Sequence, residues 1–167
     1  MDARLNFYGN TLGARFSQQI HAAAAVVVGS TLPHTTQKLV RIRASQINGS
    51  SFCTDIHFKD SLRSGETLLR LTLIATWREA SVFTDAERLA LELAERGTRL
   101  GTSTGGVSDD VWAMARKHYD EDELSALVSQ IALINTFNRI NVITRQRAGN
   151  DDLVTLHERE NLTAQPT

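Results

Sequence analysis

The stretch LVRIRASQINGSSFCTDIHFKDSLRSGET, residues 39–67, decides how this chain folds. Its first part alternates apolar residues with Arg41 and Arg43, as a strand does, but its apolar residues also fit the spacing of a helix. No second convincing strand exists for it to pair with, so we predict a helix over residues 35–48. The pair Asn48-Gly49 ends that helix, because Gly and Asn are the residues preferred at helix C-termini.

A second helix is predicted over residues 51–64, with Ser50 or Ser51 accepting one of its free backbone N–H groups as a cap. Cys53 falls in the first turn of this helix, and His57 lies one turn further along the same side. The helix dipole and the free N–H groups at this end stabilise a thiolate, and a histidine at that spacing can take the thiol proton. Cys53 and His57 are therefore the candidate nucleophile and base.

The same pattern has a structural interpretation, in which Cys53 is a small buried hydrophobic residue without reactivity and His57 is a packing residue. Spacing alone favours this structural interpretation. Asp60 follows His57 by three residues and is placed to orient its ring. One Cys and one His on a single helix supply only two metal ligands, and no other His or Cys cluster completes a set, so we predict neither a metal site nor a cofactor.

Helices are favoured along the rest of the chain, because only 2 prolines interrupt long runs rich in Ala, Leu, Glu and Arg. Thr84 and Glu87 have the spacing of a capping box and begin a helix that we expect to reach about Leu100. The acidic run 120–123 begins the last long helix, since the dipole favours negative charge at that end. This helix is predicted to end near Thr144 and to bury one apolar face: Leu124, Leu127, Val128, Ile131, Ile134 and Phe137.

Further helices are predicted over residues 13–28, 66–79 and 108–118. The chain is therefore interpreted as one compact all-α domain of about seven helices over residues 1–145. Residues 146–167 are polar and are predicted to be a tail that is disordered or pairs with another subunit.

Composition narrows the classes of function. The 18 basic and 19 acidic residues give a net charge of −1, so charge provides no drive toward nucleic acid or an anionic membrane. The longest apolar run is too short to span a bilayer, and no secretory signal is recognised at the N-terminus. A single cysteine forms no intramolecular disulfide. We therefore expect a reducing, cytoplasmic setting and neither a membrane nor a nucleic-acid partner.

A set of residues spread over 37–143 is specific in combination. The set comprises Arg43-Ala44-Ser45-Gln46-Ile47-Asn48-Gly49, Cys53, His57, Trp77-Arg78-Glu79 and Ile134-Asn135 with Asn138-Arg139. In this combination the chain resembles the alkylhydroperoxidase D and carboxymuconolactone decarboxylase family. The resemblance implies an all-helical fold whose short subunits assemble as trimers, or as hexamers built from them. It also implies an activity, since family members of the peroxidase type reduce organic hydroperoxides with a CxxC cysteine pair, a histidine and a glutamate.

On that pattern Cys53 matches the peroxide-attacking cysteine and His57 matches the histidine of the proton relay. Two positions differ, because Ser50 stands where the other cysteine would be and Lys38 where the relay glutamate would be. A serine cannot condense with an oxidised cysteine to a disulfide, so an external thiol or dithiol has to resolve Cys53. Lys38 points either at the site, where its charge favours a thiolate, or into solvent. Glu79 is another candidate carboxylate for the relay.

Three functions are compatible with these residues. The preferred one is an antioxidant thiol peroxidase that reduces organic hydroperoxides through Cys53, with His57 as base. A decarboxylase-type enzyme in which His57 is the acid or base is a second possibility. The third is a redox-inactive scaffold or binding protein, which the missing thiol at Ser50 and the missing carboxylate at Lys38 favour. Apolar helix faces wider than one small subunit needs predict a homo-oligomer in each case.

Overall fold

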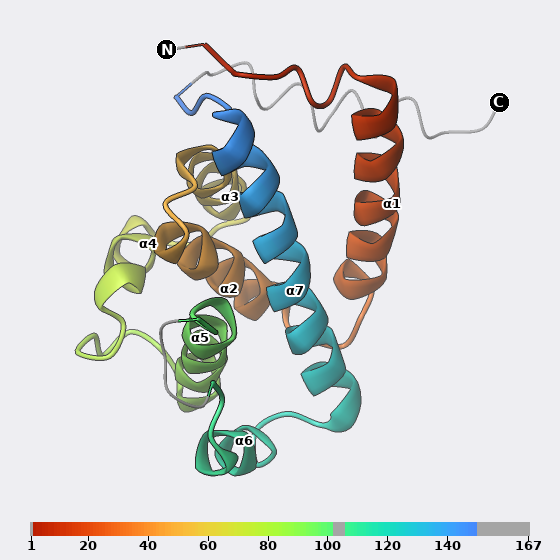
Figure 1. Ribbon diagram of the computed structural model, residues 1–167. Coiled ribbons are helices and arrows are strands. Elements are labelled where there is room, and N and C mark those ends of the chain that lie inside the picture. The colour runs from red at the N-terminus through yellow and green to blue at the C-terminus, as the bar shows by residue number, and fades with distance from the viewer. Residues whose placement is uncertain (1, 102–105, 150–167) are drawn as a thin grey trace, which may run out of the picture.

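Helices account for all the regular structure in the computed structural model, which describes residues 2–101 and 106–149 (Figure 1). The predicted all-α fold class is confirmed. Among the described helices, none combines the length and apolar character needed to cross a membrane. The elements in chain order are α1 (Thr11–Val28), α2 (His34–Ile47), α3 (Ser51–Arg63), α4 (Leu68–Leu73), the 3₁₀ turn η1 (Ile74–Thr76), α5 (Asp85–Thr98), α6 (Asp109–Ala115) and α7 (Glu121–Thr144).

Helix α2 is the centre of the fold, because it packs against α3, α5 and α7 (Figure 1). Leu39, Val40, Ile42 and Ala44 are all 1% exposed or less, so this helix buries residues on more than one side. Burial on several sides explains why its apolar residues also fit the spacing of a strand. The long helix α7 runs alongside α1. The segment before α1 crosses the C-terminal end of α7, where the Arg4 N–H donates to the Thr144 carbonyl at 2.8 Å.

The corner between α2 and α3 forms at the predicted pair Asn48-Gly49. The Ser50 N–H donates to the Ser45 carbonyl at 2.9 Å, and the Gly49 N–H donates to the Gln46 carbonyl at 3.2 Å. Gly49 has φ +65°, the left-handed conformation that this closing motif needs and that glycine adopts without strain. Because the two bonds close α2 within two residues, the next residue, Ser50, is already the N-cap of α3.

The capping box predicted at Thr84 and Glu87 of α5 is confirmed, and α7 begins with a capping box at Asp120 that was not predicted from the sequence. Thr84 accepts the Glu87 N–H while the Glu87 carboxylate accepts the Thr84 N–H, and Asp120 and Glu123 make the same pair. The predicted helix over 66–79 is too long, since α4 ends at Leu73 and gives way to a 3₁₀ turn.

Other expected boundaries differ in detail. Helix α6 ends at Ala115 rather than near 118, because the next residues form turns, and α5 ends at Thr98 rather than at Leu100. The predicted tail lies almost wholly outside the described residues, which end at 149.

One predicted core position on α7 is wrong, because Val128 is 51% exposed. The buried face of this helix extends instead toward Ala126 and Gln130, which are 5% and 4% exposed. At 100° per residue these two positions lie on the opposite flank of the Leu124–Leu127 stripe from Val128. Further along, the same stripe continues as buried asparagines rather than apolar residues.

Candidate active site

The candidate site lies at the N-terminus of α3, where Ser50 and Cys53 both face inward with exposures of 2% and 3%. The predicted side-chain cap is absent, because the Ser50 hydroxyl accepts no N–H of the helix. Closure of the α2–α3 corner leaves Ser50 with ψ 88°, whereas Thr84 and Asp120, which do cap their helices, are fully extended with ψ 163° and −179°. The Ser50 Oγ is therefore buried without a hydrogen-bond partner within the described part of the chain.

The surroundings of Cys53 are mostly apolar. It belongs to a small core cluster with Ala44 and Ile134, and Phe52 and Phe137 pack against that cluster from partly buried positions. Cys53 is the chain's one cysteine and is a free thiol. A buried sulfur in such a setting keeps its reactivity only if some polar group can stabilise its charge.

That polar group is Asn141 of α7, whose Nδ2 amide donates to the Cys53 Sγ at 3.1 Å. On its other side, the Asn141 Oδ1 accepts the Tyr8 hydroxyl at 2.8 Å. Sequence reasoning missed both residues. A signal for Asn141 did exist, because Asn135, Asn138 and Asn141 recur every three residues on a helix face that is otherwise apolar, and buried asparagines require partners.

The other two asparagines of this row connect α7 to the α2–α3 corner. Asn48 donates through its Nδ2 to the Oδ1 atoms of Asn135 and Asn138, each at 2.9 Å. Asn138 in turn donates to the Ser45 Oγ at 3.0 Å. These bonds hold α7 against the residues that set the start of α3, and so they set the distance between Asn141 and Cys53.

His57 and Lys38 belong to the packed helices α3 and α2. His57 is partly buried one turn after Cys53 on α3, as its spacing predicts. Lys38 neither points at the sulfur nor extends freely into solvent, because its Nζ forms a salt bridge with Asp60 at 3.4 Å and a hydrogen bond with Ser64. Asp60, which the sequence placed near His57, therefore has the Lys38 charge as its ionic partner.

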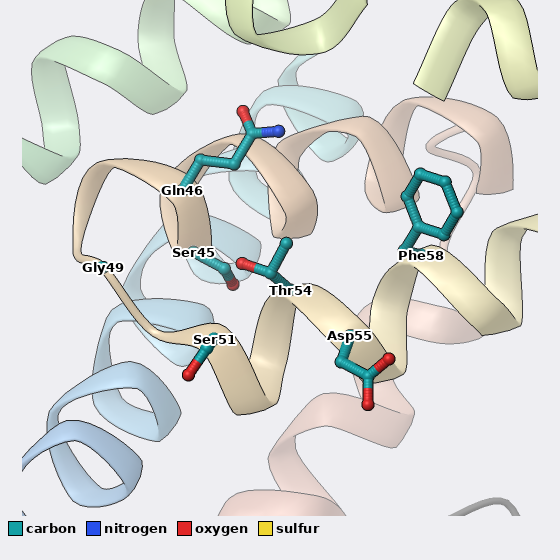
Figure 2. A pocket seen from close by; sticks show the side chains of 7 residues that line it. All are labelled: Ser45, Gln46, Gly49, Ser51, Thr54, Asp55 and Phe58. Atoms are coloured by element: carbon teal, nitrogen blue, oxygen red, sulfur yellow. The ribbon is translucent and has the colours of Figure 1, made fainter. Parts of the chain in front are cut away.

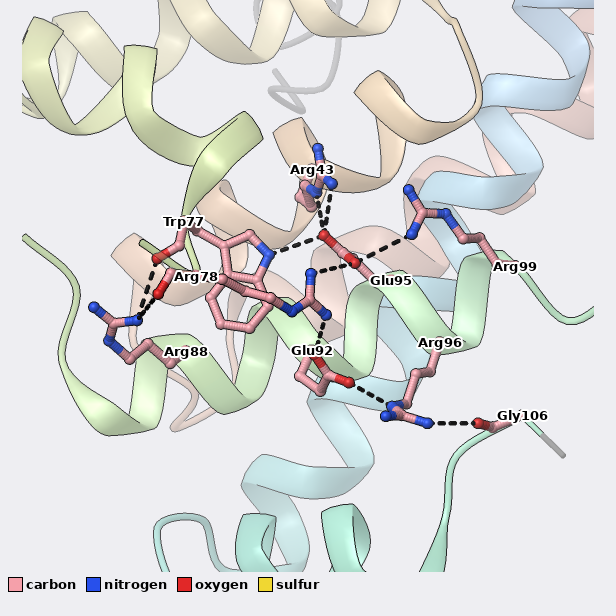
Figure 3. Close-up of polar contacts among 9 residues, drawn as sticks. All are labelled: Arg43, Trp77, Arg78, Arg88, Glu92, Glu95, Arg96, Arg99 and Gly106. Atoms are coloured by element: carbon pink, nitrogen blue, oxygen red, sulfur yellow. Dashed lines mark hydrogen bonds and ion pairs between the residues drawn. The ribbon is translucent and has the colours of Figure 1, made fainter. Parts of the chain in front are cut away.

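Glu79 follows the 3₁₀ turn η1 in the chain. It is exposed in the turn after η1, where its N–H donates to the Thr76 carbonyl, and its described contacts do not include His57. The two residues that precede it, Trp77 and Arg78, turn toward a carboxylate that sequence reasoning did not single out, Glu95 of α5 (Figure 3).

Glu95 is buried and accepts hydrogen bonds from four side chains, and we call these five residues the Glu95 cluster (Figure 3). The four donors and their distances to the carboxylate are Arg43 at 2.6 and 2.7 Å, Trp77 at 2.9 Å, Arg78 at 2.8 Å and Arg99 at 3.2 Å. Burial alone would raise the pKa of Glu95, but the hydrogen bonds from Trp77, Arg78 and Arg43, together with the Arg43 charge, lower it to about 2. The carboxylate is therefore ionised at neutral pH, and so low a pKa makes it too weak a base to take a proton from a thiol.

A cavity of about 390 Å³ opens on another side of the α2–α3 corner (Figure 2). It is lined by Ser45, Gln46, Gly49, Ser51, Thr54, Asp55 and Phe58. Cys53 and His57 are not among the lining residues, and at 100° per residue they point to a different side of α3. A second cavity, of about 340 Å³, lies beside Lys38 and Ser64, and Cys53 does not line that one either. Within residues 2–101 and 106–149, no three His, Cys, Asp or Glu side chains are grouped to hold a metal ion.

Comparison with known families and proteins gives consistent matches. The model of the carboxymuconolactone decarboxylase family matches residues 14–96. The uncharacterized protein YdfG of Bacillus subtilis is 38% identical over 119 residues, which cover 71% of this chain and 80% of that protein.

Two solved structures share the fold. A protein of unknown function from Agrobacterium tumefaciens, named as a candidate antioxidant defence protein AhpD, superimposes with a TM-score of 0.83 at 31% identity, covering 90% of this chain and 100% of that one. The debrominase Bmp8 superimposes with a TM-score of 0.73 over 87% of this chain and 77% of that one, at 16% identity, and that likeness shows the fold alone.

Proposed function

The chain belongs to the AhpD-like, carboxymuconolactone decarboxylase family, and on that premise we propose that it is a single-cysteine thiol peroxidase that reduces organic hydroperoxides. The observation that carries the proposal is the setting of Cys53. Its sulfur lies in the first turn of a 13-residue helix and receives an amide N–H from Asn141 at 3.1 Å. The helix dipole and a charge-assisted hydrogen bond both favour a thiolate over a thiol.

In the first step the Cys53 thiolate attacks the terminal oxygen of the hydroperoxide. A sulfur–oxygen bond forms and the oxygen–oxygen bond breaks, so the sulfur is oxidised by two electrons to a sulfenic acid and the peroxide is reduced to an alkoxide. His57 takes the thiol proton before the attack and returns a proton to the alkoxide, which leaves as an alcohol.

The second half of the cycle needs a thiol that the chain does not provide, because Ser50 occupies the position of the second cysteine. An external thiol condenses with the sulfenic acid, forming a mixed disulfide and releasing water. A second external thiol, or the other sulfur of a dithiol, then attacks the mixed disulfide. This step regenerates the Cys53 thiol and releases the reductant as its disulfide.

Burial of Cys53 defines how the substrate reaches it. Because Cys53 is 3% exposed and lines neither described cavity, the peroxide has to enter through a local opening. Phe52 and Phe137 are only partly buried beside the Cys53 cluster, which makes them the side chains with most freedom to move aside. Apolar side chains at the entrance suit the alkyl part of an organic hydroperoxide.

The test is turnover of tert-butyl or cumene hydroperoxide with several monothiol and dithiol reductants. We expect turnover that is abolished in Cys53→Ser and strongly reduced in His57→Ala. Ser51→Ala is the matched control, because Ser51 is an exposed serine of the same helical turn. Absence of Cys53-dependent turnover with every reductant would exclude the proposal.

The same burial favours a second candidate, a redox-inactive binding protein or scaffold that retains the fold. In that case Cys53 is a packing residue, and the lost cysteine at Ser50 has no functional consequence. Mass spectrometry after hydroperoxide treatment distinguishes the two functions, because the second predicts an unmodified Cys53.

We further propose that the chain forms a homo-oligomer, a trimer or a hexamer. Helix α1 supports this proposal, since Leu12, Phe16 and Val26 are 76%, 51% and 75% exposed on it, and large apolar side chains gain from being covered. Light scattering should give a multiple of the 18.5 kDa subunit mass, and a monomer mass at micromolar concentration would contradict the proposal.

A further inference from the structure

A chain of two hydrogen bonds leads from the N-terminal segment through α7 to Cys53. The Tyr8 hydroxyl donates to the Asn141 Oδ1 at 2.8 Å, and the Asn141 Nδ2 donates to the Cys53 Sγ at 3.1 Å. We propose that Asn141 is a positioning residue that stabilises the Cys53 thiolate, and that Tyr8 fixes the amide so that its N–H, and not its carbonyl, faces the sulfur. This inference rests on the proposed function in one respect, namely that the Cys53 thiolate is the form that reacts.

The chemistry of an amide explains why Tyr8 is needed. An asparagine side chain can present either a donor or an acceptor, and a thiolate can only accept, so the two orientations of Asn141 have opposite effects on the sulfur. With the N–H facing it, the thiolate gains a charge-assisted hydrogen bond. With the oxygen facing it, the protonated thiol would be favoured. A phenol donating to the Oδ1 holds the first orientation, because the flipped amide would lose that bond.

The position of Tyr8 is itself well determined. The segment that carries it is attached to the end of α7 by the hydrogen bond from the Arg4 N–H to the Thr144 carbonyl, and to the start of α1 by close packing. A side chain on Gly13 would place its Cβ only 2.1 Å from the Phe7 carbonyl oxygen, so the two segments are in direct backbone contact. The segment that carries Tyr8 is thus held by α1 and α7, and α3 is not needed to place Tyr8 beside Asn141.

Asn141 also lacks the freedom to move away. It is 4% exposed and lies one turn beyond Asn138, which is bonded to Asn48 and Ser45 at the α2–α3 corner. Three titratable side chains are linked to Cys53 by helix spacing or through one contacting residue: His57 on α3, Tyr8 before α1, and His21 of α1, whose ring contacts Phe137 at 5.0 Å between centroids. The carboxylate of Asp60 faces Lys38.

The experiment is a pH titration of the thiolate by its ultraviolet absorbance, which reports a buried sulfur without a reagent having to reach it. The chain has one cysteine, so subtracting the spectrum of the matching Cys53→Ser protein isolates the signal and removes the tyrosine contribution. We expect Asn141→Leu to reduce the thiolate-to-thiol ratio at neutral pH by about 10-fold, the effect of one hydrogen bond to a charged group. Tyr8→Phe should reduce it by roughly 2- to 5-fold, as part of the same interaction.

Val142→Ala is the control, because it changes the next residue of α7 at a position that is 44% exposed and leaves the asparagine row intact. A titration that shifts as far in Val142→Ala as in Asn141→Leu would overturn the proposal, since any change in this part of α7 would then have the same effect. An unshifted titration in Tyr8→Phe, a partly exposed position where folding is least at risk, would overturn the role of Tyr8. The titration involves no peroxide, so it tests the roles of Asn141 and Tyr8 whether or not the protein shows peroxidase turnover.

Discussion

The Glu95 cluster and the surroundings of Cys53 each hold one buried ionisable side chain, and the two differ in how many hydrogen bonds that side chain receives. Glu95, 3% exposed, accepts hydrogen bonds from four side chains and is ionised permanently in the working pH range. Cys53, also 3% exposed, has one amide donor, and its neighbour Ser50 has no partner in the described structure. A buried charge with a full set of hydrogen-bond donors keeps its protonation state and stabilises the fold. A buried group with few hydrogen bonds can change its charge or its bonding partners at low cost in free energy.

The largest effect expected from this comparison is on folding. Glu95→Gln removes the charge that faces the largely buried Arg43, and leaving one member of a buried pair uncompensated costs on the order of 3 kcal/mol of unfolding free energy. Urea unfolding of the wild-type chain and of Glu95→Gln measures this loss of unfolding free energy. Glu92→Gln is the control, since Glu92 pairs with the exposed Arg78 and the partly buried Arg96, and its loss should cost less than about 1 kcal/mol. Equal losses of unfolding free energy in Glu95→Gln and Glu92→Gln would contradict the claim that the buried Glu95 contributes more to stability than Glu92.

The same cluster predicts how stability depends on pH. The pKa of Glu95 is lowered to about 2 in the folded chain, below its ordinary value of 4.5, so the unfolded chain takes up this proton first as pH falls. Its contribution is therefore complete above about pH 4.5 and is lost between there and about pH 2, by about 3 kcal/mol in total. The stability difference between wild type and Glu95→Gln, measured by unfolding at successive pH values, should shrink over that window. A stability difference that stays constant over this pH window would contradict the lowered pKa of Glu95.

At the other region, Ser50→Cys should change the chemistry more than the fold. Positions three apart on a helix have Cβ atoms about 5–6 Å apart, so a small adjustment of the first turn allows a disulfide with Cys53. We expect peroxide to convert this variant to an intramolecular disulfide, seen as a loss of two hydrogens by mass spectrometry. The wild-type chain should instead form a mixed disulfide with the added thiol. A variant that still forms only the mixed disulfide would place residue 50 out of reach of the sulfur.

The smallest effect concerns the unpartnered hydroxyl. Ser50→Ala removes a buried Oγ that makes no hydrogen bond among the described residues, so no bond is lost and a desolvation cost is relieved. The unfolding free energy should stay within about 0.5 kcal/mol of wild type or rise slightly. Thr84→Ala is a useful contrast, since that hydroxyl does cap its helix and its loss should cost about 1 kcal/mol. A comparable loss in Ser50→Ala would reveal a partner for Ser50 outside the described residues.

Local signals account for the features that the sequence predicted correctly. Asn48-Gly49 closes α2 because glycine readily adopts the left-handed conformation there, and the capping box at Thr84 involves residues only three apart. The place of Cys53 in the first turn of α3 follows directly from that corner. These features depend on a few neighbouring residues and so can be inferred from the chain alone.

The features that the sequence did not predict depend on distant partners. Tyr8 and Asn141 are 133 residues apart, and Glu95 and Arg43 are 52 apart, so no local pattern indicates that they meet. The missing cap at Ser50 has a related cause, because its ψ angle is set by the bonds that close the preceding helix. The sequence names Glu79 as a candidate carboxylate, whereas the structure turns its neighbours Trp77 and Arg78 toward Glu95 of α5.

The most direct test of the central claim, that Cys53 is a working nucleophile resolved from outside, is mass spectrometry of the intact chain after one equivalent of organic hydroperoxide. Without added thiol we expect one oxygen added at Cys53, present as a sulfenic acid that dimedone traps. With a monothiol present we expect one molecule of that thiol bound to Cys53 as a mixed disulfide. An unmodified Cys53 under both conditions, in a folded protein, would contradict the account.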